Sequence, residues 1–187
     1  MSSSLPKLVV LDRDGVINKD SDDFIKTVDE WQPIDGSLEA IARLHDAGYT
    51  VVVATNQSGV GRGLFSVDTL WDIHRKMLAE VLEAGGYIQR IFFCLHTPED
   101  KCNCRKPKPG LMYQIADYFG RDLNGVPVIG DAERDLRAAV AVNARPMLVR
   151  TGKGETTEKS LDPEVCKEIY ANLGAAADAL IAEGSAE

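Results

Sequence analysis

Short β-branched apolar runs alternate along the chain with longer segments whose apolar residues recur at helical spacing. The runs lie at 7–12, 50–56, 90–95, 126–131 and 145–152, with predicted helices at 36–49, 66–86, 110–120, 132–143 and, last, 164–183. Strands separated by helices form βαβ units, whose crossovers place helices on both faces of a parallel sheet. The alternation therefore predicts a three-layer α/β sandwich with a mainly parallel central sheet.

A single domain without a large cap is expected over residues 1–187, with its core at about 7–152, because no large insertion interrupts the alternation. The sequence shows neither a secretory signal nor a run of about 20 apolar residues, which predicts a cytoplasmic protein with no membrane partner. The net charge of −8 argues against a nucleic-acid partner, because phosphate backbones are bound by basic surfaces. A monomer is the expected state.

Polar side chains end several of the predicted strands. Asp12 ends the first, Thr55 and Asn56 end the second, and Asp131 ends the fourth. In open parallel sheets, ligands bind beyond the carboxyl ends of the strands. These residues are therefore expected to meet at one edge of the sheet.

The segment LDRDGVIN places Asp12 and Asp14 two residues apart, directly after a buried strand, with Gly15 freeing the turn. Such a segment can also be a simple polar turn with no catalytic role. Carboxylates crowded at one edge repel each other, however, unless a hard cation neutralises them, and oxygen ligands suit Mg²⁺. Asp131 would be the third acid, arriving from another strand, so the three predict a magnesium site.

With Mg²⁺ bound, one aspartate can attack phosphorus and form an aspartyl-phosphate. The second aspartate can act as general acid and then as general base. Thr55 offers a hydroxyl for the phosphoryl oxygens, and Lys106 is the candidate cation. The pattern therefore predicts phosphoryl transfer from a small anionic substrate.

The loop at 94–109 carries the pattern Cys-x-His-x5-Cys-x-Cys, formed by Cys94, His96, Cys102 and Cys104. These could be unrelated loop thiols. In a reducing compartment, clustered thiols are more often metal ligands than disulfides, and three thiolates with one imidazole close a structural Zn²⁺ site. Such a site would hold the following residues, Arg105 and Lys106, over the aspartate edge.

These motifs resemble the haloacid dehalogenase (HAD) superfamily of phosphatases, in order, from about residue 8 to 152. TNQSGVGRG, CRKPKPG and VRTGKG look like the D-glycero-D-manno-heptose 1,7-bisphosphate phosphatase family within it. The resemblance implies an HAD-like Rossmannoid fold and hydrolysis of the C7 phosphate, which leaves the heptose 1-phosphate. In that family the reaction serves the nucleotide-activated heptose pathway to lipopolysaccharide core.

The resemblance also implies roles for individual residues. Asp12 would be the nucleophile and Asp14 the general acid and base, while Thr55 and Lys106 would bind phosphate. Mg²⁺ would be held by Asp12, Asp131 and the backbone carbonyl of Asp14. The implied substrate contacts are Asp20, Ser21, Asp22, Asp23, Asn56, Gln57, Ser58 and Arg105. We also expect Arg62 of the Gly-rich loop to contact a phosphate.

One position departs from the family pattern, because Ala132 stands where members often carry lysine, with Arg134 as its substitute. The short spacing of the metal loop, with five residues between His96 and Cys102, fits the histidinol-phosphate phosphatases equally well, and these remain the alternative. A polynucleotide 3′-phosphatase shares the chemistry but is disfavoured by the net charge. A receiver-like module that uses Asp12 as phospho-acceptor would not need the Cys3His cluster.

Overall fold

The computed structural model describes residues 7–184 and contains one open, parallel sheet of six strands. The strands are β1 (Lys7–Leu11), β2 (Tyr49–Asn56), β3 (Ile88–Cys94), β4 (Pro127–Gly130), β5 (Arg145–Val149) and β6 (Glu168–Tyr170). Their order in the sheet is β3-β2-β1-β4-β5-β6, and every neighbouring pair is parallel. The predicted parallel sheet is confirmed, with the five predicted strands in it.

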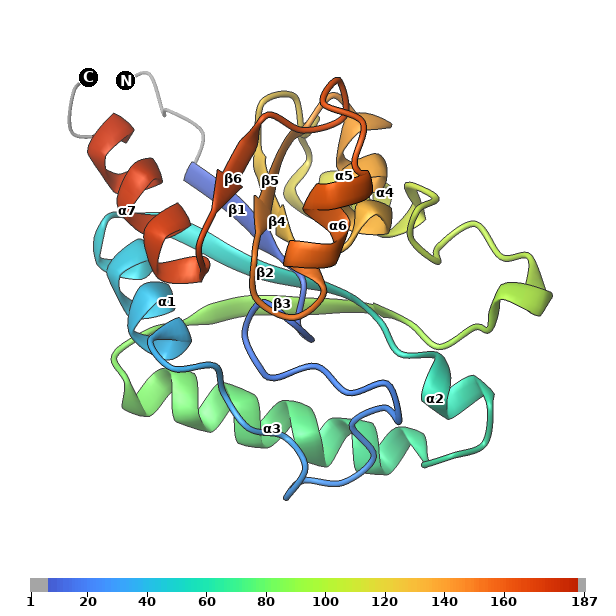
Figure 1. Ribbon diagram of the computed structural model, residues 1–187. Helices are drawn as coiled ribbons and strands as arrows, with labels where there is room; N and C mark the ends of the chain where they lie inside the picture. The colour runs from blue at the N-terminus through green and yellow to red at the C-terminus, as the bar shows by residue number, and fades with distance from the viewer. Residues whose placement is uncertain (1–6, 185–187) are drawn as a thin grey trace.

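Helices cover both faces of this sheet (Figure 1). Helices α1 (Ser37–Asp46), α3 (Val67–Glu83) and α7 (Leu173–Gly184) lie on one face, and α4 (Gly110–Phe119) and α5 (Glu133–Val140) lie on the other. The short helices α2 (Ser58–Gly61), η1 (Pro98–Asp100) and α6 (Gly154–Ser160) lie in the connections between these elements. The arrangement is the expected three-layer sandwich. None of the helices between residues 7 and 184 combines the length and apolar character that crossing a bilayer requires.

The central strand β1 is buried on both sides, which explains its unbroken apolar run. Val9 and Leu11 pack into the core under α1, α3 and α7, whereas Leu8 and Val10 pack into the core under α4 and α5. Successive side chains of a strand point to opposite faces, so a strand between two helical layers needs apolar residues at every position.

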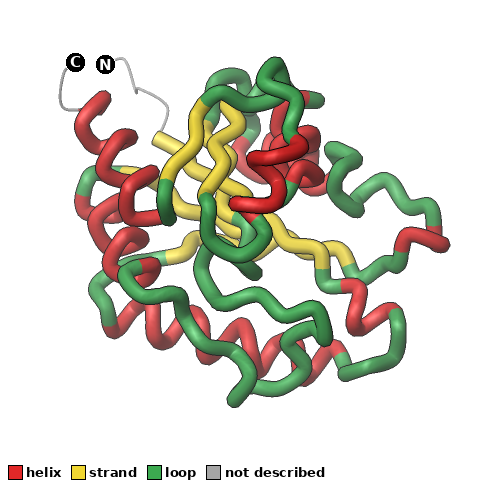
Figure 2. Tube along the Cα trace, in the orientation of Figure 1, coloured by secondary structure: helices red, strands yellow, loops and turns green. Residues whose placement is uncertain are grey.

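The position of β1 also determines where a ligand can bind. The chain places β2 and β3 on one side of β1 and β4 to β6 on the other, so the direction of winding reverses between β1 and β4. A crevice opens at the carboxyl ends of two such strands. The amide of Asp12 donates to the carbonyl oxygen of Ile129 at 2.9 Å, which fixes the residue after β1 beside the end of β4. The long connections 12–36 and 95–109 also leave from carboxyl ends (Figure 2).

The predicted helix at 164–183 is wrong in its first half. Residues 168–170 form the edge strand β6, and helix α7 begins only at Leu173, where the side chain of Asn172 accepts from the amide of Ala175 at 3.0 Å. The strand forms because it pairs with β5, more than 15 residues earlier in the chain. In addition, the guanidinium of Arg145 in β5 forms an ion pair with the carboxylate of Glu168 at 2.6 Å. Local apolar spacing does not report such a long-range pairing.

The predicted helix would have included Cys166. In the structure this residue lies in the turn before β6 instead. It is buried, as expected for a small apolar side chain, and its thiol donates to the carbonyl oxygen of Pro146 at 3.2 Å. The same thiol lies 3.2 Å from the carbonyl oxygen of Glu168. Cys166 thus ties the turn to the edge of the sheet.

His74 of α3 is fully buried, and neither ring nitrogen has a hydrogen-bond partner among residues 7–184. Its ring packs edge-on against Trp71 and at a tilt against Phe93. Burial, together with the nearby charge of Arg13, lowers the pKa of His74 to about 3. The imidazole is therefore neutral in the folded protein at any pH near neutrality.

We expect His74→Leu to make the stability of the protein less sensitive to acid. In the wild type the unfolded chain binds a proton at His74 below about pH 6.5 and the folded chain does not, so stability falls as the pH drops from 6.5 towards 3. This group contributes up to about 1.4 kcal/mol per pH unit in that window. The measurement is the free energy of unfolding in urea at pH 7, 6 and 5. An unchanged slope in the variant would contradict the assignment.

Candidate active site

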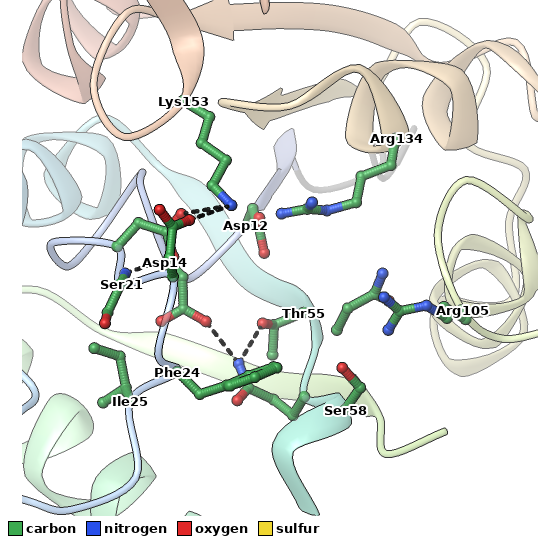
Figure 3. Close-up of a pocket in the computed structure, with 14 residues that line it drawn as sticks. Asp12, Asp14, Ser21, Phe24, Ile25, Thr55, Ser58, Arg105, Arg134 and Lys153 are labelled. Atoms are coloured by element: carbon green, nitrogen blue, oxygen red, sulfur yellow. Dashed lines mark hydrogen bonds and ion pairs between the residues drawn. The ribbon is translucent and has the colours of Figure 1, made fainter. Parts of the chain in front are cut away.

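A polar cavity of about 150 Å³ lies at the crevice between β1 and β4 (Figure 3). It is lined by Asp12, Asp14, Asp20, Ser21, Asp22, Phe24, Ile25, Thr55, Asn56, Gln57, Ser58, Arg105, Arg134 and Lys153. Most of the predicted catalytic and substrate-binding residues are therefore brought together in one cavity. Asp23, Arg62 and Lys106 are not among the lining residues; the side chains of Asp23 and Arg62 are exposed to solvent, whereas that of Lys106 is buried.

A cluster of three buried carboxylates lies at the base of this cavity. Asp12, Asp131 and Asp135 each offer an oxygen, and these oxygens all lie within 4.8 Å of one another. Burial, followed by the charge of Asp135, raises the pKa of Asp12 to about 6. Burial, followed by the charges of Asp12 and Asp135, raises the pKa of Asp131 to about 8. Like charges held this close in a low dielectric demand compensation by cations.

Lys106 supplies part of that compensation. Its ammonium lies 3.0 Å from Oδ1 of Asp12 and 2.6 Å from Oδ1 of Asp135, and it donates to the carbonyl oxygen of Ala54 at 2.7 Å. The side-chain amide of Asn56 brackets the Lys106 backbone, donating to its carbonyl at 3.0 Å and accepting from its amide at 3.1 Å. Both the backbone and the ammonium group of Lys106 are thus held in place.

The loop after β5 holds Asp131 in place. The amide of Lys153 donates to Oδ2 of Asp131 at 2.8 Å, and the hydroxyl of Thr157 donates to its backbone carbonyl at 2.9 Å. Gly15 and Gly152 both adopt positive φ and press against the carboxylate so closely that a Cβ at either position would collide with it. Oδ1 of Asp131 has no hydrogen-bond partner among residues 7–184. The loop therefore orients one carboxylate oxygen and leaves the other available for a ligand.

Asp14 is held by three donor side chains. The Arg13 guanidinium contacts both of its oxygens at 2.9 to 3.1 Å, and the amides of Asn18 and Gln57 donate to it at 2.9 and 2.8 Å. Burial alone would raise the pKa of Asp14. The Arg13 charge and the hydrogen bonds outweigh burial and hold the pKa of Asp14 below its usual value.

The four residues of the Cys-x-His-x5-Cys-x-Cys pattern meet in the loop after β3. The sulfur of Cys104 lies 3.1 Å from that of Cys94 and 3.5 Å from that of Cys102, and Nδ1 of His96 lies 3.2 Å from the Cys104 sulfur. These separations are far longer than a disulfide bond of about 2.05 Å. They are close to the sulfur spacing of about 3.8 Å around a tetrahedral ion with 2.3 Å bonds. The cluster can therefore hold a metal ion.

The structure adds site residues that sequence reasoning missed. Asp135 is the second aspartate of the segment GDAERD (130–135), four residues after Asp131, so the sequence carries a local signal that could have identified it. Lys153 lies in VRTGKG, and its ammonium lies 3.1 Å from Asp22 and 3.6 Å from Asp20, which ties the loop after β1 to the loop after β5. Phe24 and Ile25 form an apolar wall of the cavity. No local sequence pattern identifies these two residues as part of a site.

The fold and the cavity define a class of enzyme. An aspartate beyond the central strand, a second aspartate two residues later, a buried lysine and a further acid pair at the topological switch point are the arrangement of an HAD-type phosphatase. In agreement, residues 103–176 match the family model described as HAD-hydrolase-like.

Comparison with known proteins narrows the class. The chain is 52% identical over 174 residues, or 93% of its length, to the D-glycero-beta-D-manno-heptose-1,7-bisphosphate 7-phosphatase of Pseudomonas aeruginosa, of which the match spans 97%. It is 55% identical over 151 residues to the protein of the same name from Neisseria meningitidis, with 81% of each chain covered. The chain belongs to the D-glycero-beta-D-manno-heptose-1,7-bisphosphate 7-phosphatase family.

A solved structure gives the same answer at the level of the fold. The D,D-heptose 1,7-bisphosphate phosphatase from B. bronchiseptica, in complex with magnesium and phosphate, superimposes with a TM-score of 0.92 at 49% identity. The match covers 95% of this chain and 99% of that one. The histidinol-phosphate alternative is not favoured by these similarities.

Proposed function

We infer that this protein is a phosphatase that removes the C7 phosphate from D-glycero-D-manno-heptose 1,7-bisphosphate and leaves the 1-phosphate. The observation that carries the inference is the buried Asp12 carboxylate at the base of a cavity, with Lys106 at 3.0 Å, in a chain of this family. By the same membership, we propose that the reaction serves heptose activation for lipopolysaccharide core, and that the β anomer in the relatives' names is the substrate.

We propose that the reaction has two steps. Asp12 attacks phosphorus, the bond from phosphorus to the C7 oxygen breaks, and Asp14 gives a proton to the departing oxygen. Water then attacks the phosphorus of the aspartyl-phosphate, Asp14 takes the water's proton, and Asp12 is released with inorganic phosphate. Lys106 and the Thr55 hydroxyl bind the phosphoryl oxygens during both steps.

The residues present fit Mg²⁺. The three buried carboxylates have one ammonium between them, and the buried Oδ1 of Asp131 lacks a partner among the described residues, so a divalent ion would complete the charge balance. Asp12, Asp131 and the backbone carbonyl of Asp14 would hold it. When bound, the ion screens the charge between carboxylate and phosphate.

We propose that Arg134 binds the phosphate that is not hydrolysed. Arg134 lines the cavity half-buried, and among residues 7–184 its guanidinium has no hydrogen bond or ion pair. Lys106 and Lys153, by contrast, are each paired with two aspartates. Arg105 faces the same cavity, and burial together with the charge of Arg134 lowers its pKa. Two neighbouring guanidiniums favour the binding of a dianion between them. Because the side chain of Ala132 has no group that binds phosphate, Arg134 would supply the positive charge in its place.

The substrate assignment is tested by kcat/KM with Mg²⁺ on both anomers of the heptose bisphosphate and on histidinol phosphate. We expect the β bisphosphate to exceed histidinol phosphate by at least about 100-fold. Asp12→Asn should lower turnover by at least about 10³-fold while circular dichroism stays unchanged. Comparable kcat/KM values on the two compounds would overturn the assignment of substrate, and a robust rate in Asp12→Asn would overturn that of the nucleophile.

For Arg134→Gln we expect KM for the bisphosphate to rise about tenfold or more, because a charge-assisted contact to phosphate is lost. KM for the heptose 7-phosphate, which lacks the second phosphate, should change much less. Ala132→Lys in the Arg134→Gln background should recover part of the loss. Equal losses on the two substrates would show that Arg134 does not read the second phosphate.

We propose that the Cys3His cluster holds a structural Zn²⁺. Its four side chains leave no open coordination position for water, which is typical of structural sites. Arg105 follows Cys104 directly, and its guanidinium donates to the His96 carbonyl at 3.3 Å. A metal at the base of the loop would therefore hold Arg105 and Lys106 over the carboxylates.

Zinc analysis of the purified protein should give about one ion per chain, and Cys102→Ser should lose it. The melting temperature and turnover should fall with the zinc, because Lys106 loses its support. Cys166→Ser is the matched control, since it changes a cysteine outside the cluster, and it should retain the zinc. Protein purified without zinc but fully active would contradict the proposal.

We further propose a cytoplasmic monomer in which residues 1–187 act as one domain on a small sugar phosphate, with no nucleic-acid or membrane partner. A reducing compartment would keep the three cysteine ligands available for metal, which supports this assignment.

A further inference from the structure

Arg13 lies between the two aspartates of the DRD motif, and its side chain is completely buried. A buried guanidinium is costly unless it is paired, so its partners indicate its role. Nε and Nη2 both lie within 3.1 Å of Oδ1 of Asp14, and Nη2 also reaches Oδ2 at 3.1 Å. Asp12, the other aspartate of the motif, bonds the backbone amide of Arg13 at 2.8 Å but not its guanidinium. Of the two aspartates, the Arg13 guanidinium thus contacts only Asp14.

Gln57 extends this contact to the phosphate-binding strand end. Its Oε1 accepts from Nη2 of Arg13 at 3.1 Å, and its Nε2 donates to Oδ2 of Asp14 at 2.8 Å and to the Thr55 hydroxyl at 2.9 Å. Figure 3 shows the two bonds from this amide to Asp14 and Thr55. Because the amide nitrogen has two hydrogens, both are used inside the protein. Gln57 was predicted to contact substrate, but its amide nitrogen has no hydrogen left to donate.

The network fixes the direction of a single carboxylate. With Asn18, three residues donate to Asp14, while 18% of the Asp14 side chain remains exposed, towards the cavity. Every contact is a donor, so these residues favour the ionised form of Asp14, which is the form that can accept a proton from the cavity side. Asn18 is itself fully buried, and its amide also donates to the Lys19 carbonyl at 3.0 Å, which anchors the network to the loop after β1.

We propose that Arg13, with Gln57 as its partner, is a positioning residue that aims Asp14 at the water which hydrolyses the aspartyl-phosphate. In that step the water oxygen bonds to phosphorus and the bond from phosphorus to Asp12 breaks. The water's proton passes to Asp14, and inorganic phosphate leaves. The proposal rests on the aspartyl-phosphate chemistry of the proposed function but not on the identity of the sugar.

The experiment uses p-nitrophenyl phosphate with Mg²⁺, because p-nitrophenolate leaves without needing a proton while hydrolysis of the phosphoenzyme still needs the base. In Arg13→Gln, steady-state turnover should fall about 10²-fold, the usual contribution of a positioned base. The fraction of enzyme trapped as phosphoenzyme by acid quench should rise several-fold above the wild-type fraction, with a burst of about one p-nitrophenolate per active enzyme. A merely structural defect would lower turnover without raising that fraction.

Gln57→Leu should shift the phosphoenzyme fraction in the same direction, and it decides the question if Arg13→Gln does not fold. Asp14→Asn should cause the larger accumulation, and adding Arg13→Gln to it should cost nothing further, because Arg13 acts through Asp14. Arg43→Gln, which removes an exposed arginine paired with Asp178, is the matched control. An unchanged phosphoenzyme fraction in both Arg13→Gln and Gln57→Leu, or fully additive losses in the double variant, would overturn the proposal. An enzyme inactive on heptose bisphosphate would still report on it, so the two failures are distinguishable.

Discussion

The site depends on the repulsion among three carboxylates that the fold buries beside one another. Asp12, Asp131 and Asp135 are all nearly inaccessible to solvent, and one ammonium, that of Lys106, lies 3.0 Å from the first and 2.6 Å from the third. A cluster of this kind is stable only if its surroundings hold every charge in place. Much of the local structure around the crevice serves this requirement, and the same unbalanced charge is what suits the site to a divalent ion and a phosphate.

Three separate segments meet this requirement by different means. Asn56, at the end of β2, brackets the backbone of Lys106 with its side-chain amide, while the Cys3His loop brings Lys106 to that point. The loop after β5 uses the amide of Lys153 and the absence of a side chain at Gly152 to orient Asp131. Preorganised charge of this kind stabilises a transition state more than mobile charge does, because no reorganisation is needed during the reaction.

The two aspartates of the DRD motif are treated differently by the fold. Asp12 faces the acid cluster, and its pKa is raised by burial and by Asp135, whereas Asp14 faces Arg13 and Asn18, and its pKa is lowered. The proposed nucleophile and the proposed acid–base group therefore lie in different environments, and the Arg13 guanidinium, which contacts only the second of the two aspartates, contributes to that difference. The spacing of the motif is therefore as important as its two carboxylates.

The sequence by itself determined the layers and the strand ends that carry chemistry, because buried parallel strands need unbroken apolar runs and the polar residue that ends each run is conspicuous. Asp12, Thr55, Asp131 and the Cys3His spacing could be found in this way, since each depends on neighbours in the chain. Only the tertiary structure decided that residues 168–170 form a strand, that Lys153 supports Asp131, and that Gln57 donates to Asp14. These features are contacts between segments distant in sequence, and local spacing carries no information about such contacts until the chain is folded.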